Sequence, residues 1–219
     1  MRRKSVIVFA LILIFVIAPL IWGYLVVKDA IEFKEKLGTS KNLILLSSKG
    51  TFLAGFEITP DTKSLVFLNS TELTKLQQSK IEEYHDSYYK IIVFDESALQ
   101  DLPEKLEFDN QTFEKEFFIN LLLSPDPIDY YVKNKLGIEN NSADYFSAYK
   151  NIQSETTQDM TQLKSMLFAQ GILYLFEKNE MYIFYAIKTG KAKVYPETPL
   201  FKTLKFIPKG FLDFLAEKI

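Results

Sequence analysis

Residues 5–27 constrain this chain more than any other stretch, because they contain no charged side chain over 23 positions. A helix rises about 1.5 Å per residue, so one of this length covers the bilayer's hydrocarbon core, roughly 30 Å thick. A cleavable signal peptide has a shorter apolar core and small residues at its cleavage site, whereas here Ala18 precedes Pro19. A buried core helix rarely lacks a polar face over this length. We therefore predict an uncleaved signal anchor that forms a transmembrane helix.

The charges around this apolar run predict its orientation. Arg2, Arg3 and Lys4 precede it without an acidic residue, whereas residues 28–36, which follow it, contain three lysines and three acidic residues. The positive flank stays in the cytoplasm, and Trp22 and Tyr24 then lie at the outer membrane interface, which suits aromatic rings. The prediction is a single-pass protein of the cell membrane with a cytoplasmic tail (1–4), a transmembrane helix (5–27), a stem (28–41) and an extracytoplasmic domain (42–219).

The composition of the outer part excludes several classes of partner. After residue 27 there are 23 lysines against 28 acidic residues, a net charge of −5, and no arginine. Such a domain has no electrostatic basis for binding nucleic acid. Its seven glycines are isolated, so it lacks a phosphate-binding loop, and we expect no nucleotide. The chain has no cysteine, which excludes disulfides and thiolate metal sites.

Strand-like and helix-like segments alternate after residue 41, which favours one α/β domain with a mixed sheet and flanking helices. Pro60 and Asp61 predict the turn of a hairpin between two of the strands. Residues 172–195 indicate a meander of three strands, with a helix continuing through Phe176 as the alternative. The other predicted strands are residues 42–47, 51–58, 64–69 and 90–94. The predicted helices are residues 72–83, 113–123, 128–136, 140–151, 154–170 and 209–218.

The C-terminal tail is rich in phenylalanine and lysine, and two structures fit it. It could form an interfacial helix on the outer leaflet beside the anchor, or a helix that packs on the core while its lysines reach solvent. Pro199 and Pro208 interrupt the stretch, which favours packing.

Four carboxylates are the candidate catalytic residues. Asp95 and Glu96 follow the strand 90–94, and ligands of open α/β sheets bind at the carboxyl ends of strands. Asp126 and Asp129 flank Pro127 and add two more carboxylates. Together they could hold a divalent metal or act as a carboxylate pair in glycoside chemistry. The alternative is that they cap helices.

The single histidine, His85, is the other candidate ligand. On a helix Glu82 and His85 would share one face, at a spacing that can hold a divalent metal. The alternative is a solvated helix end, because the neighbours are polar. A serine or cysteine triad would have to use this histidine, and no serine lies in a Gly-x-Ser-x-Gly elbow. No cofactor is predicted, with a divalent metal as the alternative.

Three Asn-X-Ser/Thr sequons begin at Asn69, Asn110 and Asn140. They are candidate glycosylation sites on an outer domain.

Three segments resemble the LytR-CpsA-Psr (LCP) family of membrane-anchored envelope proteins. These segments are residues 42–46, residues 56–69 with the Pro60-Asp-Thr-Lys turn, and residues 127–132 (Pro-Ile-Asp-Tyr-Tyr-Val). The resemblance implies an α/β domain and transfer of lipid-linked glycopolymers, with arginines on a pyrophosphate and aspartates on a metal. Where the family has its Arg-Asp pair, this chain has Thr71, Glu72 and Leu73. Lysine is only a point charge and does not replace the bidentate arginine, so the fold could persist without the activity.

From these observations we predict a non-catalytic binding or structural module of the cell envelope, whose partner is an envelope protein or a surface glycan. The alternative is an LCP-like glycopolymer transferase, or another carboxylate- or metal-dependent enzyme that acts on a surface glycan. A third hypothesis is a fixed subunit of a larger membrane complex.

Overall fold

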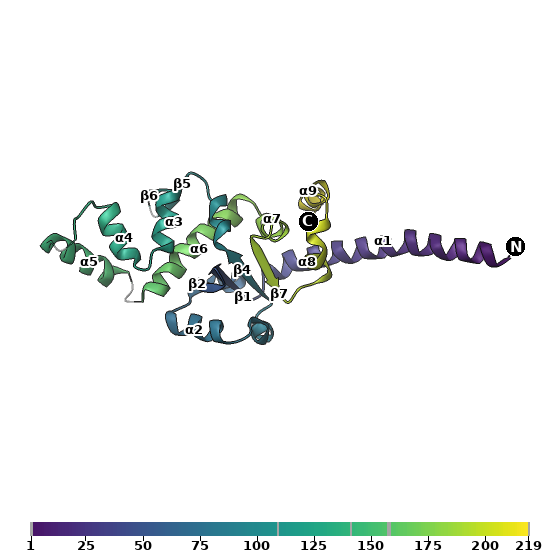
Figure 1. Ribbon diagram of the computed structural model, residues 1–219, viewed down its shortest axis with the longest axis horizontal. Helices are drawn as coiled ribbons and strands as arrows, with labels where there is room; N and C mark the ends of the chain where they lie inside the picture. Colours follow the sequence, from purple (N-terminus) through teal and green to yellow (C-terminus); the bar gives the residue numbers. More distant parts are fainter. Residues whose placement is uncertain (1, 109, 141, 157–158, 219) are drawn as a thin grey trace.

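The computed structural model describes residues 2–108, 110–140, 142–156 and 159–218, with side chains from residue 13 to residue 214. Its centre is a mixed five-stranded sheet in the order β3-β2-β1-β4-β7 (Figure 1). Strands β1 and β4 are parallel, and the other neighbouring pairs are antiparallel. The strands are β1 (Asn42–Ser48), β2 (Thr51–Thr59), β3 (Ser64–Phe67), β4 (Lys90–Asp95) and β7 (Ala192–Tyr195). A separate hairpin joins β5 (Lys105–Phe108) to β6 (Gln111–Glu114).

Nine α-helices are found in the described part of the chain. They are α1 (Arg2–Leu37), α2 (Ser70–Gln78), α3 (Lys115–Leu123), α4 (Pro127–Asn134), α5 (Ala143–Glu155), α6 (Met160–Lys178), α7 (Tyr182–Lys188), α8 (Pro199–Thr203) and α9 (Lys209–Lys218). Short 3-10 helices are η1 (Pro60–Thr62), η2 (Ile81–Ser87), η3 (Glu96–Asp101) and η4 (Leu204–Phe206).

Both faces of the sheet are covered, which explains the nearly continuous apolar run of β1. Successive side chains of a strand point to opposite faces. Leu43 and Leu45 therefore pack with α2, whereas Ile44 and Leu46 belong to the larger core that contains α6. The predicted mixed sheet with flanking helices is confirmed.

Several predicted elements are confirmed and others are wrong. The hairpin at Pro60 and the C-terminal helix form as expected, and α6 continues through Phe176, which was the alternative. The prediction of a three-stranded meander over residues 172–195 is wrong, because residues 182–188 form helix α7 and β7 is the one strand in this range. The helix predicted for residues 154–170 does not stop before Gly171, which lies inside α6. A Cβ there would lie 3.1 Å from Cε1 of Phe118, so this glycine provides packing space within α6.

Two local details also differ from expectation. The hairpin β5–β6 precedes α3, so Phe113 lies in a strand and not in the helix predicted for residues 113–123. Helix α2 is capped by Asn69, which lies before the predicted helix start at residue 72. The Asn69 side chain accepts from the backbone N–H of Glu72 at 3.0 Å, and the Glu72 carboxylate accepts from the backbone N–H of Asn69. This reciprocal capping box makes α2 begin at Ser70, before the predicted start at residue 72. At its other end α2 stops at Gln78, and η2 replaces the predicted last turns.

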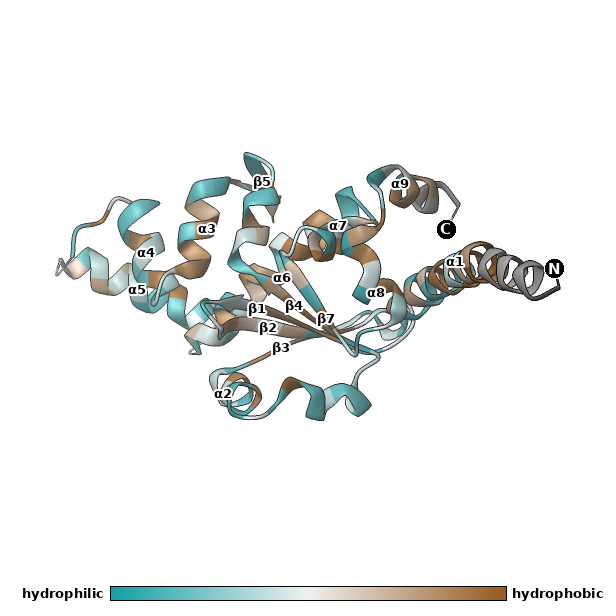
Figure 2. Cartoon of the chain, turned by 45° about the vertical axis from the view of Figure 1, so that its right-hand side comes forward, coloured by the Kyte–Doolittle hydropathy of each residue, from teal (hydrophilic) through white to brown (hydrophobic). Residues whose placement is uncertain are grey.

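Helix α1 is one continuous helix, and it is long and apolar enough to cross a membrane. The same length and composition fit a signal sequence. Only 11% of an 18-residue apolar stretch within Leu13–Leu37 is buried, which is unlike the core helix of a soluble domain. Figure 2 shows the apolar part of α1 projecting from the domain.

The last turns of α1 belong to the domain core. Val26, Ala30 and Phe33 are buried, and the Phe33 ring packs edge-on against Phe184 and Phe201, with centroids 5.3 and 4.9 Å apart. The segment predicted as a stem is therefore packed against the domain.

Candidate functional site

The N-terminus of α4 brings two of the predicted carboxylates together. Pro127 occupies the first helical turn, where its missing N–H costs nothing. Asp126 is the N-cap, and its Oδ1 accepts a hydrogen bond of 3.0 Å from the backbone N–H of Asp129. The second Asp126 oxygen and the Asp129 side chain remain for other partners.

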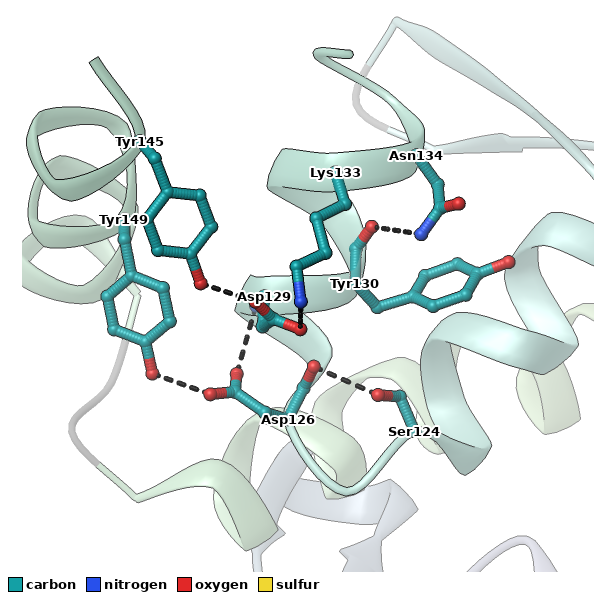
Figure 3. A network of polar contacts seen from close by, with 8 residues as sticks. All are labelled: Ser124, Asp126, Asp129, Tyr130, Lys133, Asn134, Tyr145 and Tyr149. Atoms are coloured by element: carbon teal, nitrogen blue, oxygen red, sulfur yellow. Dashed lines mark hydrogen bonds and ion pairs between the residues drawn. The ribbon is translucent and has the colours of Figure 1, made fainter. Parts of the chain in front are cut away.

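Helix α5 supplies those partners from two tyrosines one turn apart (Figure 3). Tyr149 donates to Oδ2 of Asp126 at 2.8 Å, and Tyr145 donates to Oδ1 of Asp129. Lys133 donates to the other Asp129 oxygen at 2.6 Å. The two tyrosine contacts join α4 to α5 through charge-assisted hydrogen bonds, whereas the Lys133 contact lies within α4.

The protonation states of this network follow from its contacts. Burial raises the pKa of Asp129, but hydrogen bonds from Lys133 and Tyr145 outweigh burial and hold the pKa below its usual value. The hydrogen bond to Asp129 raises the pKa of Tyr145 to about 12. Burial, followed by the hydrogen bond to Asp126, raises the pKa of Tyr149 to about 12. Asp129 is therefore ionised and both tyrosines are protonated at neutral pH. A carboxyl group that acts as a general acid needs the opposite shift.

These shifts predict the titration of Tyr145. In Asp129→Asn the negative charge beside the hydroxyl is gone, so the Tyr145 pKa falls from about 12 toward the ordinary value near 10. The wild-type tyrosine stabilises the fold below its unfolded-state pKa, and this stabilisation is lost as the pH rises through the folded-state pKa. Nuclear magnetic resonance of tyrosine ring carbons measures the titration. Asp144→Asn is the matched control and should leave the Tyr145 pKa unchanged; an unchanged pKa in Asp129→Asn would contradict the assigned hydrogen bond.

The other two carboxylates lie apart from this network. Asp95 caps η3, where its Oδ1 accepts from the backbone N–H of Ser97 at 3.0 Å. Hydrogen bonds from Ser97 lower the pKa of Asp95. Neither Asp95 nor Glu96 is a partner of Asp126 or Asp129, and no three acidic or histidine residues group around a metal-sized space in the described chain.

Glu82 and His85 lie in the exposed 3-10 helix η2 and not on an α-helix. The two ring nitrogens of His85 contact the backbone carbonyl of Glu82 at 2.6 Å and a carboxylate oxygen of Asp86 at 3.0 Å. Both nitrogens are thus engaged locally, and the Glu82 carboxylate is not among their partners.

The remaining predicted residues are placed as follows. Asn69 is the α2 cap, whereas Asn110 and Asn140 are exposed. Trp22 and Tyr24 are exposed on α1. Arg2, Arg3 and Lys4 lie in α1, and their side chains are outside the described residues.

An apolar cavity of about 250 Å³ is the feature that the sequence did not reveal. It lies beside the carboxylate–tyrosine network, among β6 and helices α3 to α6. Its lining is Gln111, Phe113, Leu121, Pro127, Ile128, Tyr131, Ile152, Thr156, Leu163 and Leu167. Most of these residues belong to apolar stripes that predict core packing, and a stripe does not show where packing leaves a gap.

No known protein family, curated protein or solved structure matches this chain. The resemblance to the LCP family therefore depends on the quoted sequence segments alone.

Proposed function

We propose that this chain is a single-pass, membrane-anchored protein whose outer domain is a non-catalytic binding module of the cell envelope. Its N-terminus is cytoplasmic, and the domain recognises a partner protein through the apolar cavity among β6 and α3–α6. The observation that carries the proposal is that cavity, with its apolar lining and its partly exposed rim residues Ile152 and Leu163.

The chemistry of the lining favours a protein over a glycan. Gln111, Tyr131 and Thr156 supply its few polar groups, whereas a sugar needs hydrogen bonds for most of its hydroxyls. The volume, about 250 Å³, is below the roughly 300–1,000 Å³ of small-molecule sites. An engineered cavity of about 150 Å³ holds one benzene. The space thus suits one or two apolar side chains of a partner.

The carboxylate–tyrosine network supports a non-catalytic role. Asp126 and Asp129 accept hydrogen bonds from the two tyrosines of α5, and these bonds fix α5 against α4, next to the cavity. Ile152 on α5 and Ile128 on α4 both line the space. The network therefore holds two walls of the cavity in place, and we assign it a positioning role.

The lobe of α4 and α5 lies at the end of the molecule opposite the projecting part of α1 (Figure 1). With α1 in the membrane, the cavity is on the distal side of the domain. A partner can approach it without entering the bilayer.

Site-specific photo-crosslinking tests the cavity. The photoreactive residue benzoylphenylalanine replaces Tyr131, which lines the cavity. In the control it replaces Val66, which is exposed on the edge strand β3 and does not line the cavity. In cells of the native host we expect a discrete protein adduct from position 131 only. Adducts of equal yield from both positions, or none from position 131, would overturn the proposal.

A cavity-filling variant sharpens this test. Leu163→Trp adds an indole at the rim, so the adduct from position 131 should fall about ten-fold, since a lost apolar contact is worth on the order of 1.5–3 kcal/mol. Thermal unfolding of Leu163→Trp shows whether the domain remains folded. A folded variant with an undiminished adduct contradicts binding in the cavity.

A further inference from the structure

Helix α1 enters the domain without a spacer between its exposed apolar part and its buried part. What this implies for the domain surface rests on the proposed role of α1 as a membrane anchor. Leu25 is exposed, whereas Val26, the next residue, is fully buried in the domain core. One residue of helix spans about 1.5 Å, and the headgroup layer beyond the hydrocarbon core is only about 5–8 Å thick. Domain surfaces beside Val26 are therefore at the depth of the lipid headgroups once α1 spans the bilayer.

The surface at this position is formed by residues 199–214 of α8, η4 and α9, which we call the collar. Helix α8 packs against α1, and both views place α9 on the side of the domain from which α1 projects (Figures 1 and 2). The inner face of the collar is buried in the core: Leu200, Phe201, Leu204, Ile207 and Leu212.

The outer face of the collar combines exposed aromatic rings with positive charge. Phe206 is 74% exposed and Phe214 is 48% exposed. The same segment has exposed lysines at positions 202, 205 and 209, and the Lys205 Nζ lies over the Phe206 ring, 5.0 Å from its centroid. The acidic Asp213 accepts a hydrogen bond from the Tyr185 hydroxyl.

We propose that the collar inserts Phe206 and Phe214 into the headgroup–acyl boundary of the bilayer that α1 crosses. Aromatic rings are favourable at this depth, and the three lysines reach the lipid phosphates while their alkyl stems cover apolar surface. The domain then has two attachments to the membrane, the anchor and the collar. Two attachments fix its tilt, so that the α4–α5 lobe points away from the bilayer.

Tryptophan quenching by brominated lipids tests this contact in the full chain. Trp22 is the only tryptophan of the protein, so Trp22→Phe provides a silent background. Phe206→Trp and the control Phe146→Trp are each made in that background; Phe146 is 53% exposed on α5. The proteins are reconstituted in vesicles of phosphatidylcholine and phosphatidylglycerol, with and without bromine on the acyl chains.

Brominated lipids should lower the emission of Phe206→Trp about two-fold, because interfacial side chains lie roughly 5–10 Å into the boundary. Emission of Phe146→Trp should not change. Quenching of wild-type Trp22 without quenching of Phe206→Trp would overturn the collar contact and leave the anchor standing. An unquenched Trp22 would overturn the anchor, and the collar proposal with it.

Discussion

Phe33→Ala is expected to lower the free energy of unfolding by about 3–5 kcal/mol, the range found for removing a buried phenylalanine ring. Phe33 is only 2% exposed, and its ring contacts Phe184 of α7 and Phe201 of α8. The alanine would leave a cavity at the junction of α1 and the domain. The loss includes the edge-on aromatic pairs, each worth about 0.5–1.5 kcal/mol beyond area burial.

Chemical denaturation of the full chain in detergent micelles, followed by near-ultraviolet circular dichroism, measures this effect. Ile31→Ala is the matched control, because Ile31 is on the same helix but 40% exposed. Its unfolding free energy should change by less than about 1 kcal/mol. Equal losses in both variants would show that α1 does not dock through Phe33.

The docking of α1 has a consequence for function. A helix joined to its domain by a flexible stem would leave the proposed binding surface free to rotate, whereas Val26, Ala30 and Phe33 of α1 are packed into the core. Burial lowers the pKa of Lys90 on β4, and the carboxylates of Asp29 and Glu32 on α1 partly offset this effect. Helix α1 and the sheet are thus joined by apolar packing and by the attraction between these two carboxylates and Lys90.

The sequence predicts the elements whose signals are local. The apolar runs of β1 and β4, the proline turn at Pro60 and the capped start of α4 at Asp126 all depend on neighbours in the chain. Helix α7 could not be predicted in this way. Its aromatic and β-branched residues favour a strand, but β7 already pairs with β4 at this side of the sheet. Tyr182 instead stacks on Phe94, and its hydroxyl donates to the carbonyl of Ala98.

The candidate site was predictable in part. The spacing of Asp126 and Asp129 around Pro127 predicts a capped helix start and places two carboxylates close together. Their hydroxyl donors, Tyr145 and Tyr149, are a helical turn apart in a segment predicted to be helical, but sequence alone does not show which helix faces them. The distance from Asp126 to Asp95 and the gap that forms the cavity depend on tertiary packing. No local pattern encodes either of them.

Gly55→Ala should lower the free energy of unfolding by about 1–3 kcal/mol, the cost of overpacking a close-packed core. Gly55 pairs with Leu45 across β1 and β2, and its N–H donates to the buried hydroxyl of Ser165 on α6 at 3.1 Å. A Cβ at Gly55 would lie 2.5 Å from Cδ2 of Leu45 and 3.1 Å from the carbonyl oxygen of Ile44. The leucine can rotate, but the backbone oxygen belongs to the paired strand, so β2 must shift and strain the Ser165 contact.

Urea denaturation in micelles measures the loss of unfolding free energy in Gly55→Ala. Gly210→Ala is the control, since a Cβ there meets nothing within 4 Å and alanine favours the helix α9. An unaltered midpoint for Gly55→Ala would show that the sheet and α6 tolerate a wider spacing than the structure has.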